Sequence, residues 1–446
     1  MIRRLVILTA VVATGCFDFD NAYNQYCDGG RCNDGGSTGG GGATAGGGGG
    51  ATGGGGATGG GTGGGDMGGG TGGGAGGGTM GGGTGGGTGG GATGGGGGTT
   101  PDAGCQSFLC PAIDWTSPRS SIHYEVAPGL MTESLNRFHV MASFEANLPG
   151  SNNFTHFEYR FIDGGAPVAI QRFLDNRVET RQLRGNSMTD YFVPYRTSMA
   201  RFENSSTATN FYACNLPDGG MTDPWHYAVY PVSADEFWLV GYPNSICHWT
   251  RSGGLVATVD PDTQPNLYHQ DVYRSTTGEV YAVGGFYTSN LGTGAIYRED
   301  GTAVPYSPGP LLDSWYSDGF NSIDGTGGAN DRIYVLGRSN SMDRGEIFQL
   351  QSDGGFERVY TAPFRLARLD VMPTGEVWAA GSAFDRVVYF DGGVWADHLL
   401  PTTEFRSTVF WENVNGTDEG IILTGFEIQE DGGRAAIVNS YRRFGK

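Results

Sequence analysis

The chain is poor in positive charge and in long apolar runs. Its 446 residues include 27 Lys and Arg against 46 Asp and Glu, which gives a formal net charge of −19. A nucleic-acid binder needs a basic surface for the phosphates, so we expect no nucleic acid partner. Beyond the N-terminus, no segment is long and apolar enough to cross a membrane. The acidic composition favours solubility and leaves cationic or neutral ligands open.

The sequence also lacks the short motifs of common catalytic and metal sites. It contains no G-x-S-x-G elbow, no H-E-x-x-H pair, no P-loop and no EF-hand loop. Its seven histidines are scattered, and no C-x-x-C or His-x-His spacing accompanies them. We therefore expect no metal, no cofactor and no catalytic residue. His139 and His248 lie inside apolar strand patterns, which favours a structural role for both.

The N-terminus indicates export. Arg3 and Arg4 precede an apolar run at residues 5–13, which is too short to span a bilayer but suits a signal peptide. The next residues, Ala-Thr-Gly-Cys ending at Cys16, resemble a bacterial lipobox, although that family usually has Leu where this chain has Ala13. The resemblance implies a signal peptide at residues 1–15 and a lipid on Cys16.

That lipid would anchor the chain to the cell envelope, and we expect an outer-membrane lipoprotein of a Gram-negative bacterium. Ordinary secretion, with Cys16 removed or left as a free thiol, is the alternative. The cysteines agree with export, because six remain after Cys16 and an even number in an exported chain indicates disulfides. Proximity suggests three pairs, although fifteen pairings exist for six cysteines: Cys27 with Cys32, Cys105 with Cys110, and Cys214 with Cys247.

Glycine dominates residues 34–104, interrupted mainly by Thr and Ala. Glycine buries no side chain and loses the most backbone entropy on ordering, so this tract predicts a disordered tether. A random coil of this length would span roughly 45 Å. The short segment 16–33 precedes the tether, and residues 105–446 form the expected folded domain.

The expected domain contains a repeat. Each copy has a polar turn, an apolar strand and a terminal glycine, and copies recur at intervals of about 44 residues. The clearest copies are residues 235–241 (D-E-F-W-L-V-G), 278–284 (G-E-V-Y-A-V-G), 331–337 (D-R-I-Y-V-L-G), 375–381 (G-E-V-W-A-A-G) and 419–425 (E-G-I-I-L-T-G), with weaker copies at 136–142 and 190–195.

A second strand follows each copy and ends in an Asp-Gly or similar turn, as expected of tight hairpins. These turns begin at Asp163, Asp218, Ser252, Asp300, Asp353 and Asp391. With one strand before each copy and one after each turn, the unit has four strands. It resembles a β-propeller blade. The resemblance implies an all-β fold with seven blades; six or eight blades, or a large β-sandwich, are the alternatives.

The propeller hypothesis makes three local predictions. Residues 122–126 would supply the outer strand of the last blade and so close the ring without a bare sheet edge. The recurring aromatic residues Trp238, Tyr281, Tyr334 and Trp378 would pack between blades. The variable loops after the terminal glycines would gather on one face around the channel, where binding residues usually lie. Candidate binding residues in these loops are Tyr287, Asn340, Arg344, Phe384 and Asp385.

Three functions fit this sequence. A non-enzymatic binding or scaffold module with an unknown protein or glycan ligand agrees with the tether, the disulfides and the missing catalytic motifs. An extracellular hydrolase or lyase acting on polysaccharide is supported by fold analogy alone. A structural protein without a small ligand is the third hypothesis. A channel mouth with converging carboxylates, Arg or Tyr would favour the enzyme.

Overall fold

The computed structural model describes residues 105–444 except 106, 118–123, 146–153, 173–181, 196–197, 204–206, 212–224, 243–244, 260–266, 287–293, 308–318, 340–343, 382–384, 402–408 and 430–432. They belong to one compact unit, Thr93–Lys446. The predicted signal peptide, Cys16, the segment 16–33 and the glycine tract lie outside the described residues. In the described part of the chain, no helix could cross a membrane.

The described secondary structure consists of strands. They are β1 (Leu109–Thr116), β2 (Tyr124–Ser134), β3 (Arg137–Glu145), β4 (Phe154–Phe161), β5 (Val168–Arg172), β6 (Arg184–Ser187), β7 (Asp190–Tyr195), β8 (Ser198–Glu203), β9 (Thr207–Phe211), β10 (Trp225–Ser233), β11 (Glu236–Tyr242), β12 (Ser245–Thr250), β13 (Gly254–Val259), β14 (Leu267–Arg274), β15 (Val280–Phe286), β16 (Gly294–Arg298), β17 (Tyr306–Ser307), β18 (Gly319–Gly325), β19 (Ile333–Ser339), β20 (Arg344–Leu350), β21 (Phe356–Ala362), β22 (Leu366–Val371), β23 (Val377–Gly381), β24 (Arg386–Phe390), β25 (Trp395–Leu399), β26 (Val409–Thr417), β27 (Gly420–Ile428) and β28 (Arg434–Arg443).

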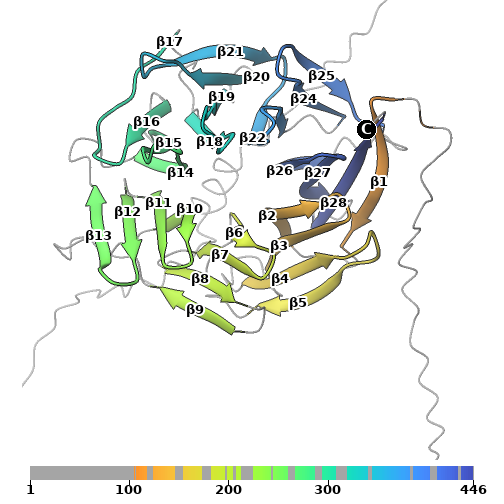
Figure 1. Ribbon diagram of the computed structural model, residues 1–446. Helices are drawn as coiled ribbons and strands as arrows, with labels where there is room; N and C mark the ends of the chain where they lie inside the picture. The colour runs from red at the N-terminus through yellow and green to blue at the C-terminus, as the bar shows by residue number, and fades with distance from the viewer. Residues whose placement is uncertain are drawn as a thin grey trace, which may run out of the picture. The chain divides into compact units, whose positions relative to one another are not determined.

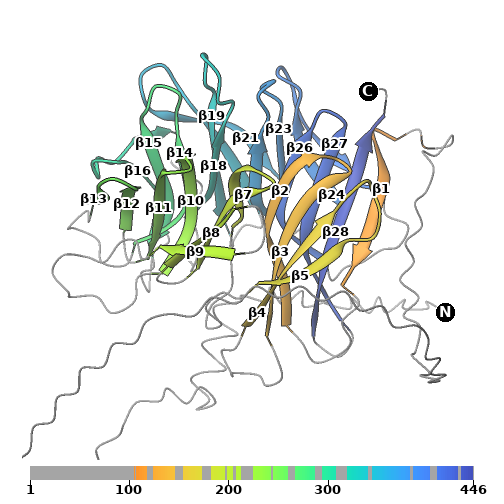
Figure 2. The same ribbon diagram turned by 60° about the horizontal axis from the view of Figure 1, so that its bottom comes forward.

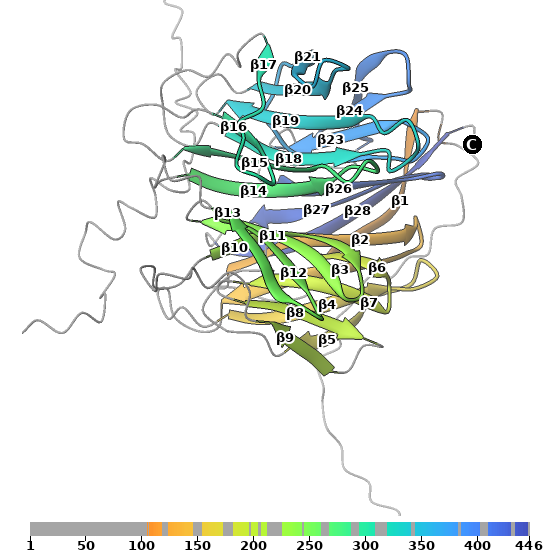
Figure 3. The ribbon, with the colours of Figure 1, turned by 60° about the vertical axis from the view of Figure 1, so that its left-hand side comes forward.

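These strands form a seven-bladed β-propeller, as the repeat predicted (Figure 1). In chain order from the innermost strand outwards, the blades are β2–β5, β6–β9, β10–β13, β14–β16, β18–β21, β22–β25 and β26–β28 with β1. The first and last blades count as one sheet because β2 also meets β28, at Tyr124 and Arg434. The fourth blade has three strands, and β17 pairs instead with β21, at the outer edge of the fifth blade (Figure 3).

In several repeats, the terminal glycine allows the innermost strand to approach its neighbour closely. A Cβ added at Gly284 would lie 1.7 Å from the carbonyl oxygen of Tyr268, and one at Gly425 would lie 1.9 Å from that of Phe410. The paired innermost strands β14 and β26 both have a register shift just beyond these glycines. Any side chain would therefore push the innermost strand away, which explains why glycine recurs at this position.

The Asp-Gly turns are hairpins between the third and fourth strands. The carboxylates of Asp353 and Asp391 accept backbone N–H bonds from Gly355 and Gly393, at 3.0 and 2.8 Å. Gly354 and Gly392 have φ values of 84° and 98°, which other L-residues rarely adopt. The predicted turn at Asp218 lies outside the described residues; in the second blade, the third and fourth strands β8 and β9 pair with Glu203 opposite Thr207.

The blades pack through the aromatic residues that recur in the second strands. Trp238, Tyr281, Tyr334 and Trp378 are all buried, which confirms their predicted role in the core. Trp378 of the sixth blade, for example, belongs to one apolar cluster with Val409 and Trp411 of the seventh. The apolar faces of neighbouring blades thus stabilise one another by removing these large side chains from water.

The prediction that residues 122–126 close the ring was wrong. The closing strand is β1, which pairs antiparallel with β28 from Leu109 to Thr116 (Figure 2). Tyr124 begins β2, the innermost strand of the first blade, because this segment continues directly into the eleven-residue strand. The preceding segment, β1, therefore occupies the outer position of the last blade. The predicted disulfide between Cys105 and Cys110 is confirmed and lies at the start of β1.

Trp115 of β1 links the last blade to the first. Its ring lies 4.7 Å from that of Tyr159 and 5.6 Å from that of Phe161, measured between centroids. We expect Trp115→Ala to lower the free energy of unfolding by about 2 kcal/mol, because it removes this contact across the closure. Urea denaturation followed by fluorescence would measure the change. Val394→Ala is the control, because Val394 is 65% exposed. Equal urea midpoints for the two variants would contradict the role of Trp115 in closing the ring.

Candidate functional site

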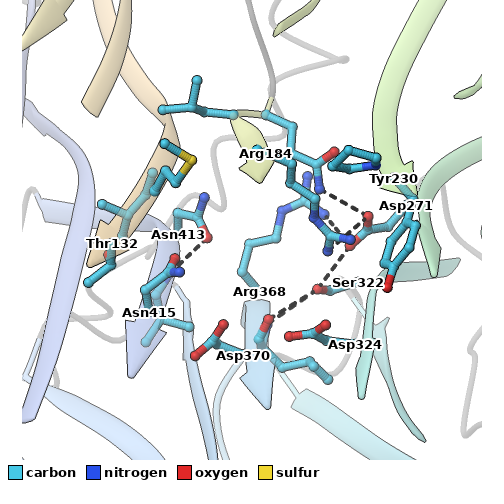
Figure 4. Close-up of a pocket in the computed structure, with 18 residues that line it drawn as sticks. Thr132, Arg184, Tyr230, Asp271, Ser322, Asp324, Arg368, Asp370, Asn413 and Asn415 are labelled. Carbon is cyan, nitrogen blue, oxygen red and sulfur yellow. Dashed lines mark hydrogen bonds and ion pairs between the residues drawn. The ribbon is translucent and has the colours of Figure 1, made fainter. Parts of the chain in front are cut away.

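A cavity of about 300 Å³ lies in the channel at the centre of the ring (Figure 4). Each of the seven innermost strands, or the residues directly before it, contributes to its wall. The lining is mostly polar and contains five charged side chains. It consists of Leu130, Met131, Thr132, Gln182, Leu183, Arg184, Gly185, Tyr230, Pro231, Asp271, Ser322, Asp324, Arg368, Leu369, Asp370, Asn413, Val414 and Asn415.

The polar side chains reach the cavity because they alternate along the innermost strands. In β18, β22 and β26 the polar lining positions are two residues apart, with an apolar residue between them. Side chains at i and i+2 of a strand point to the same side. The polar pairs are Ser322 with Asp324, Arg368 with Asp370, and Asn413 with Asn415. The rigid sheet therefore presents each pair to the channel.

These polar side chains also bind the next blade. An innermost strand has a sheet neighbour on one side only, so backbone N–H groups on its other edge need another acceptor. Asp324 Oδ2 accepts the N–H of Val371 at 3.0 Å, and Asp370 Oδ2 accepts that of Gly416 at 2.8 Å. The same contact joins Gln182 to Val229 at 2.9 Å and Asp271 to Ile323 at 3.2 Å.

Asp271 is the centre of the charged part of the wall and is 1% exposed. Two guanidiniums flank its carboxylate: Arg184 at 3.6 Å and Arg368 at 3.4 Å. Gln182 donates a third contact, at 3.1 Å. Both arginines also bind backbone carbonyls, Arg184 that of Val272 and Arg368 that of Asn321. Both arginines of the cavity therefore already bind Asp271 and backbone carbonyls of the cavity wall.

Asp324 and Asp370 have a different environment. Among the described residues neither forms an ion pair, although each accepts the backbone N–H bond noted above. Burial, opposed by the charge of Arg184, raises the pKa of Asp324 to about 6. Burial together with the negative charge of Asp324 raises the pKa of Asp370 to about 7. Near neutral pH these two carboxyls are therefore partly protonated, whereas ordinary aspartates are fully ionised.

Few of the sequence-predicted binding residues can be placed. Arg344 is exposed at the start of β20, and Asp385 forms an ion pair with Arg386 at 3.2 Å. Neither lines the cavity. Tyr287, Asn340 and Phe384 lie outside the described residues, so the role of the loops in binding stays a prediction.

Only some of the cysteines predicted to form disulfides belong to the described residues. Cys27, Cys32 and Cys214 lie outside the described residues. Cys247 is buried in β12 and disulfide-bonded. Its predicted partner, Cys214, cannot be assessed, so this pairing stays a prediction.

His139 and His248 have the structural roles that the sequence favoured. Nδ1 of His139 lies 2.8 Å from Oε1 of Glu158, a fully buried carboxylate. Burial alone would raise the pKa of Glu158, but hydrogen bonds from His139, Arg160 and Tyr191 and the charge of Arg172 hold it well below its usual range. This cluster joins the first blade to the second and lies outside the cavity lining. His248 pairs with Glu236 at 2.9 Å.

The cavity residues were not among the sequence-predicted candidates, which were all chosen from the variable loops. A signal was present: several strands that precede repeat copies carry charge within an apolar pattern, as in L-A-R-L-D-V (residues 366–371) and N-S-I-D-G (residues 321–325). A charge inside a buried strand needs a partner or a cavity. The structure pairs Asp324 with Tyr334 and Asp370 with Trp378, so both carboxyls lie beside the recurring aromatic residue of their blade.

No protein-family model and no curated protein matches this chain. Solved structures of similar fold include a virginiamycin B lyase from Staphylococcus aureus, 11% identical with a TM-score of 0.46, covering 71% of this chain and 98% of that one. The WD40 β-propeller domain of Doa1 is 10% identical with a TM-score of 0.47, covering 74% and 97%. YCF48 bound to D1 peptide is 13% identical with a TM-score of 0.46, covering 75% and 96%. These values carry no inference about ligand or chemistry.

The raised pKa of Asp370 predicts a pH-dependent stability. Between the ordinary aspartate pKa and about 7, the folded chain holds a proton that the unfolded chain releases, so stability falls as the pH rises through this window. Asp370→Asn keeps an oxygen acceptor for Gly416 and does not titrate. We expect its stability to gain on the natural chain by about 4 kcal/mol between about pH 4 and about pH 8, since the pKa of Asp370 changes by about three units on folding.

Urea denaturation across this pH range would measure the difference. Asp397→Asn is the matched control, since Asp397 is an exposed carboxylate on β25. A constant offset between Asp370→Asn and the natural chain at every pH would contradict the raised pKa.

Proposed function

We propose that this protein is a binding module held at the cell envelope, with its ligand site in the central cavity. Cys16 carries the lipid, residues 34–104 are the tether, and the propeller presents the cavity to the outside. The lipobox resemblance and the glycine composition support the anchor and the tether. The alternative of plain secretion leaves the binding site unchanged.

The observation that carries the proposal is the convergence of polar side chains from all seven blades on one cavity. Ligand sites are concave, with a few polar groups placed by a rigid scaffold. Here the side chains are fixed before any ligand arrives, because Asp271, Asp324 and Asp370 are each held by backbone N–H groups of a neighbouring blade. Binding therefore costs little additional ordering of the protein.

A protein or a glycan of the envelope is the expected source of the ligand. The cavity lies at the lower end of the volume range of ligand pockets, so it accommodates a side chain or a single small residue of a larger partner. The variable loops after β15, β19 and β23 would then contact the remainder of that partner.

Catalysis on polysaccharide is the second candidate, and two observations favour it. Carboxylates, arginines and Tyr230 converge in the channel, which is the arrangement expected of an enzyme. Asp324 and Asp370 have pKa values of about 6 and about 7, the range of carboxyls that act as general acids near neutral pH. Glycosidases use two carboxyls on either side of the scissile bond. In this chain both carboxyls also bind the backbone of the next blade, which gives them a structural reason to be present.

A binding screen with the full chain separates these candidates. Purified envelope proteins and glycans would be tested by biolayer interferometry, and release of reducing ends would be followed on the same glycans. We expect a ligand that binds without turnover. Asn415→Trp fills the cavity and should lower the affinity for this ligand by about tenfold or more. Turnover that Asp370→Asn abolishes would favour the second candidate instead.

Two further variants control this experiment. Val394→Trp adds the same indole at an exposed position on the outer edge of a blade, and it should bind as the natural chain does. Thr132→Leu is a milder obstruction, because the Thr132 hydroxyl makes no hydrogen bond whose loss would destabilise the fold. A ligand that all three variants bind equally well does not occupy the cavity.

A further inference from the structure

We propose that the cavity binds a primary alkylammonium group, either a lysine side chain of a partner or a small aliphatic amine, with its cation held by Asp324 and Asp370. This inference rests on the proposed function, since it names the chemistry that the cavity would recognise. The argument comes from the charges of the wall, the hydrogen-bond acceptors that face the cavity and the volume enclosed.

The charge of the wall favours a cation. The lining contains two guanidiniums and three carboxylates. Arg184 and Arg368 both contact Asp271, at 3.6 and 3.4 Å, and both bind backbone carbonyls as well. Within the described residues, Asp324 and Asp370 have no comparable cationic partner. A monocation placed between them would neutralise the remaining negative charge, and an anionic ligand would find no available arginine.

The hydrogen-bond geometry suits an ammonium group. Asp370 Oδ2 accepts the N–H of Gly416 and Asp324 Oδ2 accepts that of Val371, so each carboxylate keeps a second oxygen for a ligand. The two carboxylates lie beside each other on one side of the cavity, with Asn415 next to Asp370 (Figure 4). An ammonium has three donors and no acceptor. Two carboxylates and an amide oxygen match that number.

The rest of the wall suits an aliphatic stem. Leu130, Met131 and Leu183 come from the first two blades and form an apolar part of the lining. The volume of about 300 Å³ accommodates a small unbranched chain. Apolar contact along the methylene groups adds about 0.8 kcal/mol for each one buried, which separates an alkylamine from a bare inorganic cation.

A divalent metal fits less well. Calcium takes six to eight oxygen ligands, usually from several carboxylates. In the described part of the chain no group of three or more His, Cys, Asp or Glu gathers in a way that could hold a metal ion. Asp271 is the third carboxylate of the cavity, and the two arginines already neutralise it.

Binding of an amine would be coupled to pH. The ionisable groups that face Asp324 and Asp370 are Arg184 of β6, Tyr230 of β10, Asp271 and Tyr273 of β14 and Arg368 of β22. The arginines and the tyrosines do not change charge near neutral pH. A cation therefore displaces the proton from the two carboxyls, and its affinity rises with pH until both are ionised.

Isothermal titration calorimetry of the full chain would test the proposal, with Nα-acetyl-lysine methylamide and putrescine as probes. We expect binding that strengthens by about two to three orders of magnitude between about pH 5 and about pH 8 and that releases protons to the buffer, because both carboxyls must lose their protons. Asp370→Asn and Asp324→Asn should each weaken it about tenfold or more. Stronger binding of the peptide-like probe would identify a partner's lysine, and stronger binding of putrescine a free amine.

The controls separate this inference from the proposed function. Nα-acetyl-norleucine methylamide has the stem without the charge and should not bind. Asp397→Asn removes an exposed carboxylate and so changes the net charge equally, and it should bind both amines as the natural chain does.

Two outcomes would overturn the inference. Amine binding that persists unchanged in both Asp324→Asn and Asp370→Asn would place the cation elsewhere on the acidic surface. Absence of amine binding by the natural chain would exclude this ligand class; if a glycan or protein from the screen is still blocked by Asn415→Trp, the proposed function stands without it.

Discussion

The free edge of the innermost strand is the constraint on which the rest of this propeller depends. Each innermost strand pairs with one neighbour, so part of its backbone faces the channel without a sheet partner. Asp324 and Asp370 satisfy such N–H groups on the next blade, at Val371 and Gly416. Polar side chains are therefore required at the axis, where an apolar core would leave backbone donors unpaired. The same requirement surrounds the central cavity with carboxylates and amides.

The sequence predicted the ring well because the repeat reflects backbone geometry. Gly284 and Gly425 recur since a Cβ there would collide with the innermost strand, and Asp353 and Asp391 recur since each completes a hairpin turn. Such rules are local and can be recognised in one copy at a time. Closure depends instead on which of two N-terminal segments reaches β28, and that competition between distant residues has no local signature.

The candidate site was harder to predict for a related reason. Asp271 becomes part of a charged cluster only because Arg184 and Arg368 reach it from other blades. Those residues are far apart in the sequence. Asp271 and Arg368 occupy the same position of their repeat copies, opposite Val283 and Ala380, but carry opposite charges. The sequence shows charged residues inside the strands, but whether such a residue is neutralised depends on partners from other blades. Asp324 and Asp370 form no ion pair within the described residues, although the charge of Arg184 acts on both, and burial raises their pKa values.

The pairing of β1 with β28 also has a kinetic consequence. Leu109 pairs with Arg443, so the first strand of the domain to be synthesised finds its partner only when the last has emerged. Contacts of such long sequence separation slow folding because the intervening chain must be ordered first. Until then β1 has no sheet partner and stays open to pairing with other chains. The disulfide between Cys105 and Cys110 closes a short local loop at the start of β1, so it can form early. It can then constrain this end of β1 while the other blades fold.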